Sequence, residues 1–283
     1  MKFSQFLNGL APILAVALAV GVAGCNDAKV SIGDDGKKLS ELDLGGAAPS
    51  KLVMFGPDEV QVTQGDKLAI AVDGDPAAVD KLRFTLKDGT LSILREGKLF
   101  SGDSKLAVVR VTMPAPKDVT MGGSGEISAA ALAPGATVTI LGSGRIDTQS
   151  VSGDRLEVTL PGSGSFRAAG RVGQLDLTIL GSGSAELGAV TADKAKVNVL
   201  GSGGAIFSSD GDVAATIVGS GSVTVKGRAR CTVSALGSGQ LICESGVTKR
   251  NAVEAEPAPA APAPPAAPPA SPAAPPAPPA PQP

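Results

Sequence analysis

One tripeptide, Gly-Ser-Gly, recurs through the middle of the chain and constrains the fold more than any other feature. The triplets begin at Gly123, Gly142, Gly162, Gly181, Gly201, Gly219 and Gly237, with spacings of 19, 20, 19, 20, 18 and 18 residues. A period this steady is typical of a solenoid, in which each repeat packs only against its neighbours. Glycine accepts positive φ at a tight corner and Ser supports a turn by hydrogen bonding, so we interpret each triplet as a corner of a coil.

The segments on both sides of the triplets alternate between apolar and polar residues, as strands with one buried face do. The alternation before the triplets covers residues 136–140, 156–160, 175–179, 195–199, 213–217 and 231–235. Apolar residues also occupy matching positions after the triplets, at Ile127, Ile146, Phe166, Ala185, Ala205, Val223 and Leu241. Gly and Asp near residues 135, 153, 173, 193 and 211 predict a second turn in each coil. The sequence therefore predicts an all-β, single-domain parallel β-helix with coils of about 19 residues and at least two strands per coil.

Residues 40–121 lack the period but keep strand signals, at 60–62, 68–72, 82–86, 90–94 and 106–113. Asp88-Gly89 lies between two of these segments, and this dipeptide favours a two-residue β-hairpin. We expect less regular strands here, joined to the repeats at 123–239 in one solenoid domain spanning residues 43–250.

The composition excludes several functions. The chain has no His, Trp or Tyr, so it holds no Ser-His-Asp or Cys-His pair and no imidazole metal ligand. With 25 basic and 27 acidic side chains, it has no global field that would attract nucleic acid. The triplets also lack the third glycine of a Gly-x-Gly-x-x-Gly phosphate loop. We therefore predict no cofactor, no metal, no catalytic residue and no nucleic-acid partner.

The N-terminus is predicted to be an export signal. An apolar run from Leu10 to Gly24 is too short to span a bilayer as a helix. It ends in Val22-Ala23-Gly24-Cys25, which resembles the lipobox of bacterial lipoproteins, where cleavage precedes a cysteine that carries acyl chains. We expect residues 1–24 to be removed, Cys25 to be lipidated and inserted in a membrane, and residues 25–42 to act as a tether. Asn26, rather than Asp, favours the outer membrane.

The C-terminal residues 251–283 form a Pro/Ala-rich tail, because 14 of the 22 prolines fall between residues 257 and 283. Such a composition favours polyproline II, in which 27 residues reach roughly 80 Å at about 3.1 Å per residue. Two interpretations stay open, a spacer or anchor that crosses an envelope layer and a disordered tail without a partner.

One column of predicted outward positions is a candidate ligand-facing ladder of small hydrogen-bonding residues, one per coil: Thr139, Thr159, Thr178, Asn198, Thr216 and Ser234. Such a ladder could bind sugar or ordered water, although Thr is also common on any exposed strand. Glu157 and Asp176 fall in neighbouring coils, and a pair of carboxylates is what a polysaccharide-cleaving enzyme needs. A solvated charge ladder that includes Lys196 is the simpler interpretation.

Cys231 and Cys243 lie six residues before and six after Gly237, both at predicted inward positions. Export would permit their oxidation, and the lipid on Cys25 leaves an even pair, so we predict a disulfide that caps the last coil. Two free buried thiols are the alternative.

A family resemblance rests on three segments: Glu59 to Asp66, Asp88 to Ile93, and Val111 to Pro114 leading into the first Gly-Ser-Gly and Ile127. In this order they resemble the head GIN domain family, the auto-transporter adhesin proteins, over about residues 43–246. The resemblance implies a β-helical domain, exported and often lipid-anchored in Gram-negative bacteria. It supplies no catalytic residues.

We therefore expect an exported, lipid-anchored β-solenoid of the bacterial cell envelope, in the periplasm or at the surface, which acts as an adhesin-like module that binds an envelope glycan or envelope protein. The first alternative is a structural spacer that uses the Pro/Ala tail, and an enzyme comes after it.

Overall fold

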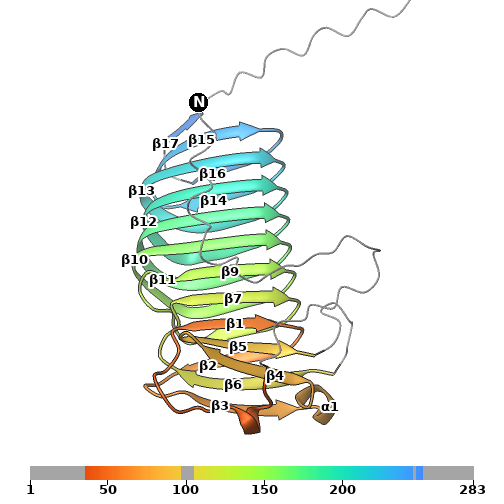
Figure 1. Cartoon of the computed structure of the whole chain (residues 1–283). Helices are drawn as coiled ribbons and strands as arrows, with labels where there is room; N and C mark the ends of the chain where they lie inside the picture. Colours follow the sequence, from red (N-terminus) through yellow and green to blue (C-terminus); the bar gives the residue numbers. More distant parts are fainter. Residues whose placement is uncertain (1–35, 97–104, 245–246, 251–283) are drawn as a thin grey trace, which may run out of the picture. The chain divides into compact units, whose positions relative to one another are not determined.

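A computed structural model describes residues 36–96, 105–244 and 247–250 of the chain, the last four by backbone only. The described part is nearly all β, with a β-solenoid of about 7 turns and coils of about 19 residues, which confirms the predicted fold class (Figure 1). The described part holds seventeen strands, one short helix and one 3₁₀ turn.

The strands before the long coils are β1 (Lys51–Phe55), β2 (Glu59–Gln64), β3 (Ala69–Gly74), β4 (Leu82–Lys87), β5 (Thr90–Arg95), β6 (Ala107–Met113), β7 (Asp118–Gly123), β8 (Glu126–Ala129) and β9 (Thr137–Gly142). The later strands are β10 (Arg145–Gly162), β11 (Ser165–Gly181), β12 (Ser184–Gly201), β13 (Gly204–Gly219), β14 (Ser222–Lys226), β15 (Arg230–Leu236), β16 (Gln240–Cys243) and β17 (Val247–Arg250). The helix α1 is Pro76–Val79 and the 3₁₀ turn is Leu39–Glu41.

The coils stack through parallel, in-register pairing and have two faces. Face 1 consists of β5, β1, β7, β9, the second halves of β10 to β13, β15 and β17. Face 2 consists of β6, β2, β8, the first halves of β10 to β13, β14 and β16. The Gly-Ser-Gly corners connect face 1 of one coil to face 2 of the next. As expected, the apolar residues that follow the triplets align in register from Ile127 to Leu241.

The long coils differ in one respect from the sequence prediction of two strands separated by a second turn. Each of β10 to β13 is one continuous strand of 16 to 18 residues. The chain bends where the register shifts, for example between Thr148 and Val151 and between Leu187 and Thr191. A bulge bends a strand while most ladder hydrogen bonds persist, so a separate turn is not required.

The triplet glycines are required by backbone geometry and by close approach. The first glycine of every triplet has positive φ, between 105° and 137°. At the third position of the fifth triplet, a Cβ on Gly203 would lie 2.6 Å from the Gly183 carbonyl oxygen. The Ser hydroxyls do not support the turns as expected, because within the described residues none of the seven makes a hydrogen bond. Their backbone N–H groups do so instead, as Ser202 donates to the Gly181 carbonyl at 3.0 Å.

The irregular N-terminal strands form two more coils in permuted order. The coil β1–β2 lies between the coil β5–β6 and the coil β7–β8, although it precedes both in sequence. Beyond β5–β6, strands β3 and β4 pair antiparallel with β6 and β5 and cover the end of the stack. The predicted hairpin at Asp88-Gly89 joins β4 to β5, with φ of 51° and 69° at its two residues.

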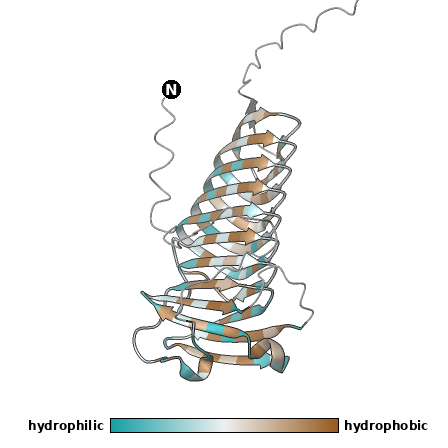
Figure 2. Cartoon of the chain, turned by 45° about the vertical axis from the view of Figure 1, so that its right-hand side comes forward, coloured by the Kyte–Doolittle hydropathy of each residue, from teal (hydrophilic) through white to brown (hydrophobic). Residues whose placement is uncertain are grey.

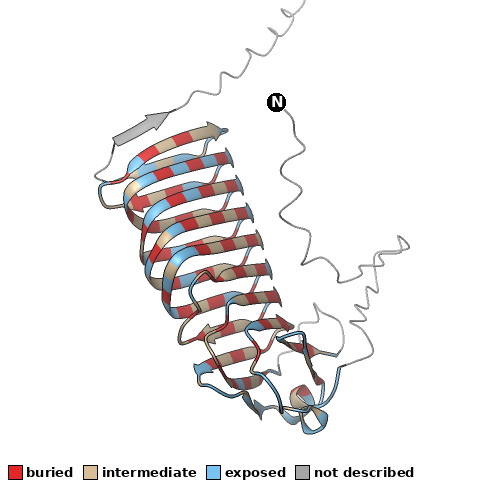
Figure 3. Cartoon of the chain, turned by 60° about the vertical axis from the view of Figure 1, so that its left-hand side comes forward, coloured by how far each residue is buried: buried red, intermediate tan, exposed pale blue. Residues whose placement is uncertain are grey.

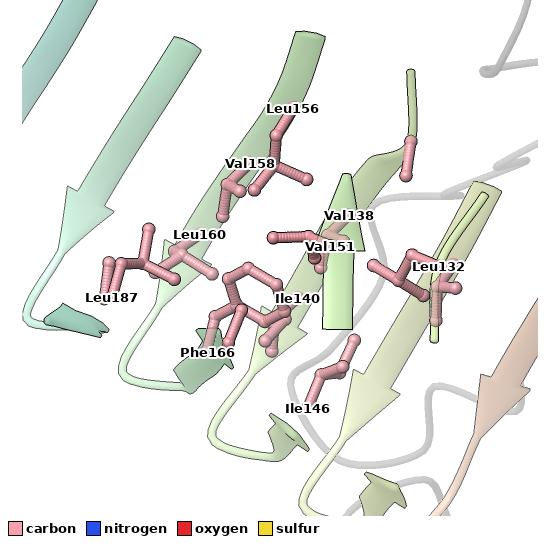
Figure 4. Close-up of a cluster of buried hydrophobic side chains, with 14 of the residues drawn as sticks. Leu132, Val138, Ile140, Ile146, Val151, Leu156, Val158, Leu160, Phe166 and Leu187 are labelled. Carbon is pink, nitrogen blue, oxygen red and sulfur yellow. The ribbon is translucent and has the colours of Figure 1, made fainter. Parts of the chain in front are cut away.

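The core is a continuous stack of aliphatic side chains between the two faces. Buried and less buried residues alternate along most of the strands whose burial is described, as Figure 3 shows by its red, tan and pale blue bands. Figure 4 shows Ile140, Leu160 and Phe166 packed together from three successive coils, and all three are completely buried. The inward positions of the predicted alternation are therefore confirmed.

The domain begins earlier than residue 43. Lys37 forms a β-bridge with Phe84, and Leu39 and Leu42 pack against the core. Residues 37–42 of the predicted tether thus lie on the domain, while residues 1–35 and the tail are outside the described residues.

Candidate functional site

The predicted ladder forms one column on face 1. Thr159, Thr178 and Asn198 pair in register on adjacent strands, and Thr139, Thr216 and Ser234 extend the column in both directions. All six side chains point outward and are half-buried or exposed. None of them makes a hydrogen bond with another described residue, so their polar atoms are available to a partner.

A second column on face 1 is apolar, and sequence reasoning missed it. Two residues after each member of the ladder, an aliphatic side chain points outward: Leu141, Pro161, Leu180, Leu200, Val218 and Leu236. Apart from half-buried Pro161, these side chains are 39% to 53% exposed. Figure 2 shows hydrophobic brown bands near the arrowheads of successive strands, where this column lies. Scattered exposed aliphatic residues are ordinary, but a contiguous row marks an interaction surface.

The sequence does carry a signal for this column. The alternation breaks before the triplets, where two apolar residues follow one another, as in Ile140-Leu141, Ile179-Leu180 and Val199-Leu200. Only one residue of each pair can point inward, because successive side chains of a strand lie on opposite faces. The second residue therefore has to be exposed.

We call the two columns together the Thr-Leu surface, defined by residues 139, 159, 178, 198, 216 and 234 and residues 141, 161, 180, 200, 218 and 236. It carries no charge and is bordered on one side by the exposed Ser residues of the triplets, such as Ser182 and Ser202. It ends below β9, because Phe55 covers Gly122 at the next position of the apolar column. An uncharged surface of aliphatic groups and free hydroxyls fits a neutral or amphipathic partner.

Charged side chains occupy the two outward columns on the other border. Glu157 and Asp176 are in register, as predicted, and Arg155 lies 3.3 Å from the first carboxylate and 2.9 Å from the second. Gln174 also donates hydrogen bonds to Asp176. The two carboxylates thus belong to a surface charge ladder, and no cleft surrounds them in the described part of the chain.

A shallow hollow of about 640 Å³ lies beside this ladder, at the start of the face 1 segments of β11 to β15. Lys194, Lys196, Asp212, Ala214 and Arg230 are among the residues that line it. Arg230 donates a hydrogen bond to Asp212 at 2.8 Å, which lowers the pKa of that carboxyl from its usual value. Neither Lys194 nor Lys196 forms an ion pair with a described residue, so the hollow has two more cations than its Arg230–Asp212 pair balances.

The cysteines fall into two groups. Cys231 and Cys243 form a disulfide across the last coil, with their Cα atoms 6.8 Å apart. Cys231 is buried on β15 and Cys243 is half-buried on β16. Cys25, the predicted lipidation site, is outside the described residues.

The described ranges, 36–96, 105–244 and 247–250, contain neither a metal-binding cluster nor a membrane-spanning helix. Among these residues, no group of three Cys, Asp or Glu side chains could hold a metal ion. Within the same ranges, no helix has the length and apolar character needed to cross a membrane.

Comparison with known proteins supplies the identification. The family model described as "Putative auto-transporter adhesin, head GIN domain" matches residues 48–229, which is more than half of the chain. The chain belongs to the head GIN domain family. The match ends at residue 229, so Cys231 and Cys243, which form the disulfide, lie beyond the family model. No curated protein sequence matches the chain.

Solved structures share the head GIN fold. A putative adhesin from Bacteroides fragilis has 21% identity and a TM-score of 0.58, covering 72% of this chain and 93% of that one. A putative lipid binding protein from Parabacteroides distasonis has 20% identity and a TM-score of 0.54, covering 71% and 93%. A putative adhesin from Parabacteroides merdae has 19% identity and a TM-score of 0.52, covering 71% and 92%. At these identities the comparison shows the fold.

The family and two of these three neighbours carry adhesin names, and the third is named a lipid binding protein, which favours a binding role at a surface or envelope over an enzymatic one. The candidate binding site is therefore an exposed face of the solenoid rather than an enclosed pocket.

Proposed function

We propose that this head GIN protein is an exported, lipid-anchored binding module of the bacterial cell envelope, which uses the Thr-Leu surface to hold an envelope glycan or an envelope protein. The observation that carries the proposal is the surface itself, in which outward aliphatic side chains from six coils, five of them exposed, lie beside hydroxyl and amide groups that make no hydrogen bond in the described protein. Binding sites for neutral polymers need apolar contact and hydrogen-bonding groups in one plane, and here both repeat at the coil spacing of about 4.8 Å.

Retention of envelope material by the purified chain tests the binding role. The double variant Leu180→Asp and Leu200→Asp places two charges in the middle of the apolar column, and we expect retention to fall at least tenfold. Thr224→Asp on face 2 is the matched control, because its half-buried outward side chain lies on the other side of the coil. Equal loss in both variants would contradict the proposed site, as would retention unchanged by the double variant.

The lipid anchor is the second part of the proposal, and it rests on Val22-Ala23-Gly24-Cys25 after the apolar run. More than one acyl chain gives stable attachment without a spanning helix. Cys25→Ser should leave the protein uncleaved or release it to the soluble fraction, as measured by membrane fractionation and N-terminal sequencing. Unchanged fractionation with a cleaved N-terminus would contradict lipidation.

A structural spacer is the alternative function, favoured by the 14 prolines between residues 257 and 283. In that case removing the tail alters envelope integrity while retention by the Thr-Leu surface stays intact. For the binding module, removing the tail leaves envelope integrity unchanged.

A further inference from the structure

The partner of the Thr-Leu surface can be deduced from the order of charges beside it. The outward column that contains Glu157 continues through Asp176 on β11, Lys196 on β12 and Ala214 on β13. The next column runs through Arg155, Gln174, Lys194 and Asp212. Each column contains one pair of opposite charges placed at equal distances from the boundary between β11 and β12. The pair is Asp176 and Lys196 in the first column, and Arg155 and Asp212 in the second.

We propose that a second copy of this chain binds the Thr-Leu surface, related by a two-fold axis that runs between β11 and β12 parallel to the strands. This inference rests on the proposed function, because it names the partner of the same face. The rotation keeps the strand direction and the columns but reverses the order of coils. Strand β11 then faces β12 of the partner, β10 faces β13, and β9 faces β15.

This arrangement pairs opposite charges. Asp176 meets the partner's Lys196, and Lys196, which has no ion pair in the described monomer, meets the partner's Asp176. Arg155 meets the partner's Asp212 in the adjacent column. Self-complementary contacts of this kind occur twice in a two-fold interface, so each favourable pair counts double.

The shape of the surface agrees with the charges. Glu157 faces the partner's Ala214, which lines the hollow together with Lys194, Lys196, Arg230 and Asp212, three cations and one acid. An acidic side chain that protrudes from one copy thus enters a basic hollow in the other.

The apolar column has the same centre as the charge pattern, although it is an independent feature. Its six positions run from Leu141 on β9 to Leu236 on β15, so its midpoint also falls between β11 and β12. Leu180 packs on the partner's Leu200, and Leu141 packs on the partner's Leu236. Packed sheets lie about 10 Å apart, which gives facing Leu side chains room to interdigitate.

Dimers whose two-fold axis is shifted along the stack of coils place like charges opposite each other. An axis on β11 would set Asp176 against the partner's Asp176, and an axis on β12 would set Lys196 against the partner's Lys196. An axis between β10 and β11 would set Glu157 against the partner's Asp176. Like charges placed opposite each other suppress such arrangements.

The size of the surface predicts a weak dimer. Five coil steps of about 4.8 Å and six residues of about 3.3 Å give a flat footprint of roughly 500 Å² on each copy. Stable specific interfaces use about 800 Å² per partner, so this one should dissociate on dilution in the micromolar range.

Reversed coil order has a consequence for adhesion. The chain enters the described domain at Gly36, next to the β-bridge of Lys37 with Phe84, at the end of the stack that β3 and β4 cover. In the dimer the two entry points lie at opposite ends. Copies that approach from two facing surfaces can therefore bind each other, which makes the adhesion homophilic.

Sedimentation velocity on the chain from residue 26 onward, which keeps every described residue, tests the dimer. We expect monomer at about 1 µM and a growing dimer fraction towards about 300 µM, as for an interface of this size. A chain that stays monomeric at the highest concentration would overturn the proposal.

A charge exchange tests the register. Asp176→Lys and Lys196→Asp each create like-charge contacts with an identical partner, so each variant alone should self-associate at least about tenfold more weakly. An equimolar mixture of the two variants restores both ion pairs and should associate as the unmodified chain does. Failure of the mixture to associate would overturn the register, as would undiminished association of either variant alone.

Glu186→Lys is the matched control, because Glu186 is an exposed acid on face 2 that forms an ion pair with Arg167 at 2.5 Å. It should leave the dimer unchanged, and circular dichroism should show the same β signal for every variant. A Glu186→Lys effect as large as that of Asp176→Lys would overturn the assignment to face 1.

Separate results would contradict the binding role of the Thr-Leu surface and the identification of its partner as a second copy of the chain. If the chain is monomeric but Leu180→Asp with Leu200→Asp abolishes retention of envelope material, the self-partner is wrong and the proposed function stands. If the chain dimerises through β11 and β12 but retains no envelope material, the self-partner stands and an envelope glycan or other envelope protein is excluded as the ligand.

Discussion

Asp58 accepts a hydrogen bond from Arg95 Nε at 2.8 Å, and their side chains are only 2% and 5% exposed. Asp58 lies between β1 and β2, and Arg95 ends β5. The Asp58 carboxylate also accepts the backbone N–H of Ala107, the first residue of β6, at 2.8 Å. This buried ion pair therefore joins the two coils whose order in space is the reverse of their order in sequence.

Replacing one partner of this pair should destabilise the domain strongly. Arg95→Met leaves the Asp58 carboxylate buried without its cation, which costs about 3–5 kcal/mol. Asp58→Asn combined with Arg95→Met removes both charges and should cost less than Arg95→Met alone. Urea unfolding curves measure both, and a double variant less stable than the single one would contradict this account.

The core prediction concerns Ile179, which is completely buried between the neighbouring coil residues Leu160 and Val199. Ile179→Asp buries a charge there and should lower the free energy of unfolding by several kcal/mol. Thr178→Asp, one residue earlier on the outward side, should change it by less than about 1 kcal/mol. Thermal melting compares the two, and similar melting temperatures would mean that the inward and outward assignments are wrong.

The inward positions were predictable because period-two alternation assigns one side of every strand to the core. The order of the first coils was not, since β1 can pair in parallel with any neighbour of similar pattern. Nothing periodic in residues 51–121 marks β5 and β7 as its two partners. The chain makes a detour through β3, α1 and β4, and this detour depends on tertiary contacts such as the Asp58–Arg95 pair.

A corner glycine offers a sharper test of the turns. Gly201 has φ of +125°, and a Cβ there would lie against the Gly181 carbonyl oxygen at 2.4 Å. Gly201→Ala should therefore cost about 2 kcal/mol or more, combining backbone strain with steric overlap. Ser202→Ala is the control and should be nearly neutral, because the Ser hydroxyls make no hydrogen bond in the described residues. A Ser202→Ala effect equal to that of Gly201→Ala would contradict this view of the corner.

The disulfide between Cys231 and Cys243 closes a loop with a sequence separation of 12 residues at the last coil. In the chain-entropy model a loop of this size contributes roughly 3 kcal/mol, and reduction should make β15 and β16 exchange amide hydrogens faster than β11. Thiol titration of the denatured, unreduced protein with Cys25 blocked should find no free thiol. Two titratable thiols would rule the bridge out.

The candidate site was only half predictable. The hydroxyl column was found because each member stands at an outward position of a clean alternation. The apolar column was missed because Leu180 and Leu200 each directly follow a core residue and so extend an apolar run, which hides their outward direction. The charge ladder through Glu157, Asp176 and Lys196 was predictable, because the three residues occupy the same position before successive triplets, and the strand register confirms it.

Oxidative footprinting of side chains tests the central claim, that the Thr-Leu surface is the binding surface, most directly. Four residues of the apolar column, Leu141, Leu180, Leu200 and Leu236, are the reporters. Leu106 and Ile242, which lie outside the Thr-Leu surface and are 47% and 48% exposed, are the internal controls. With envelope material bound, or at concentrations where the chain dimerises, the four reporter residues should be oxidised far less, while oxidation of the two controls stays the same. Reporter residues that are oxidised as fast in the bound protein as in the free, dilute chain would contradict the account.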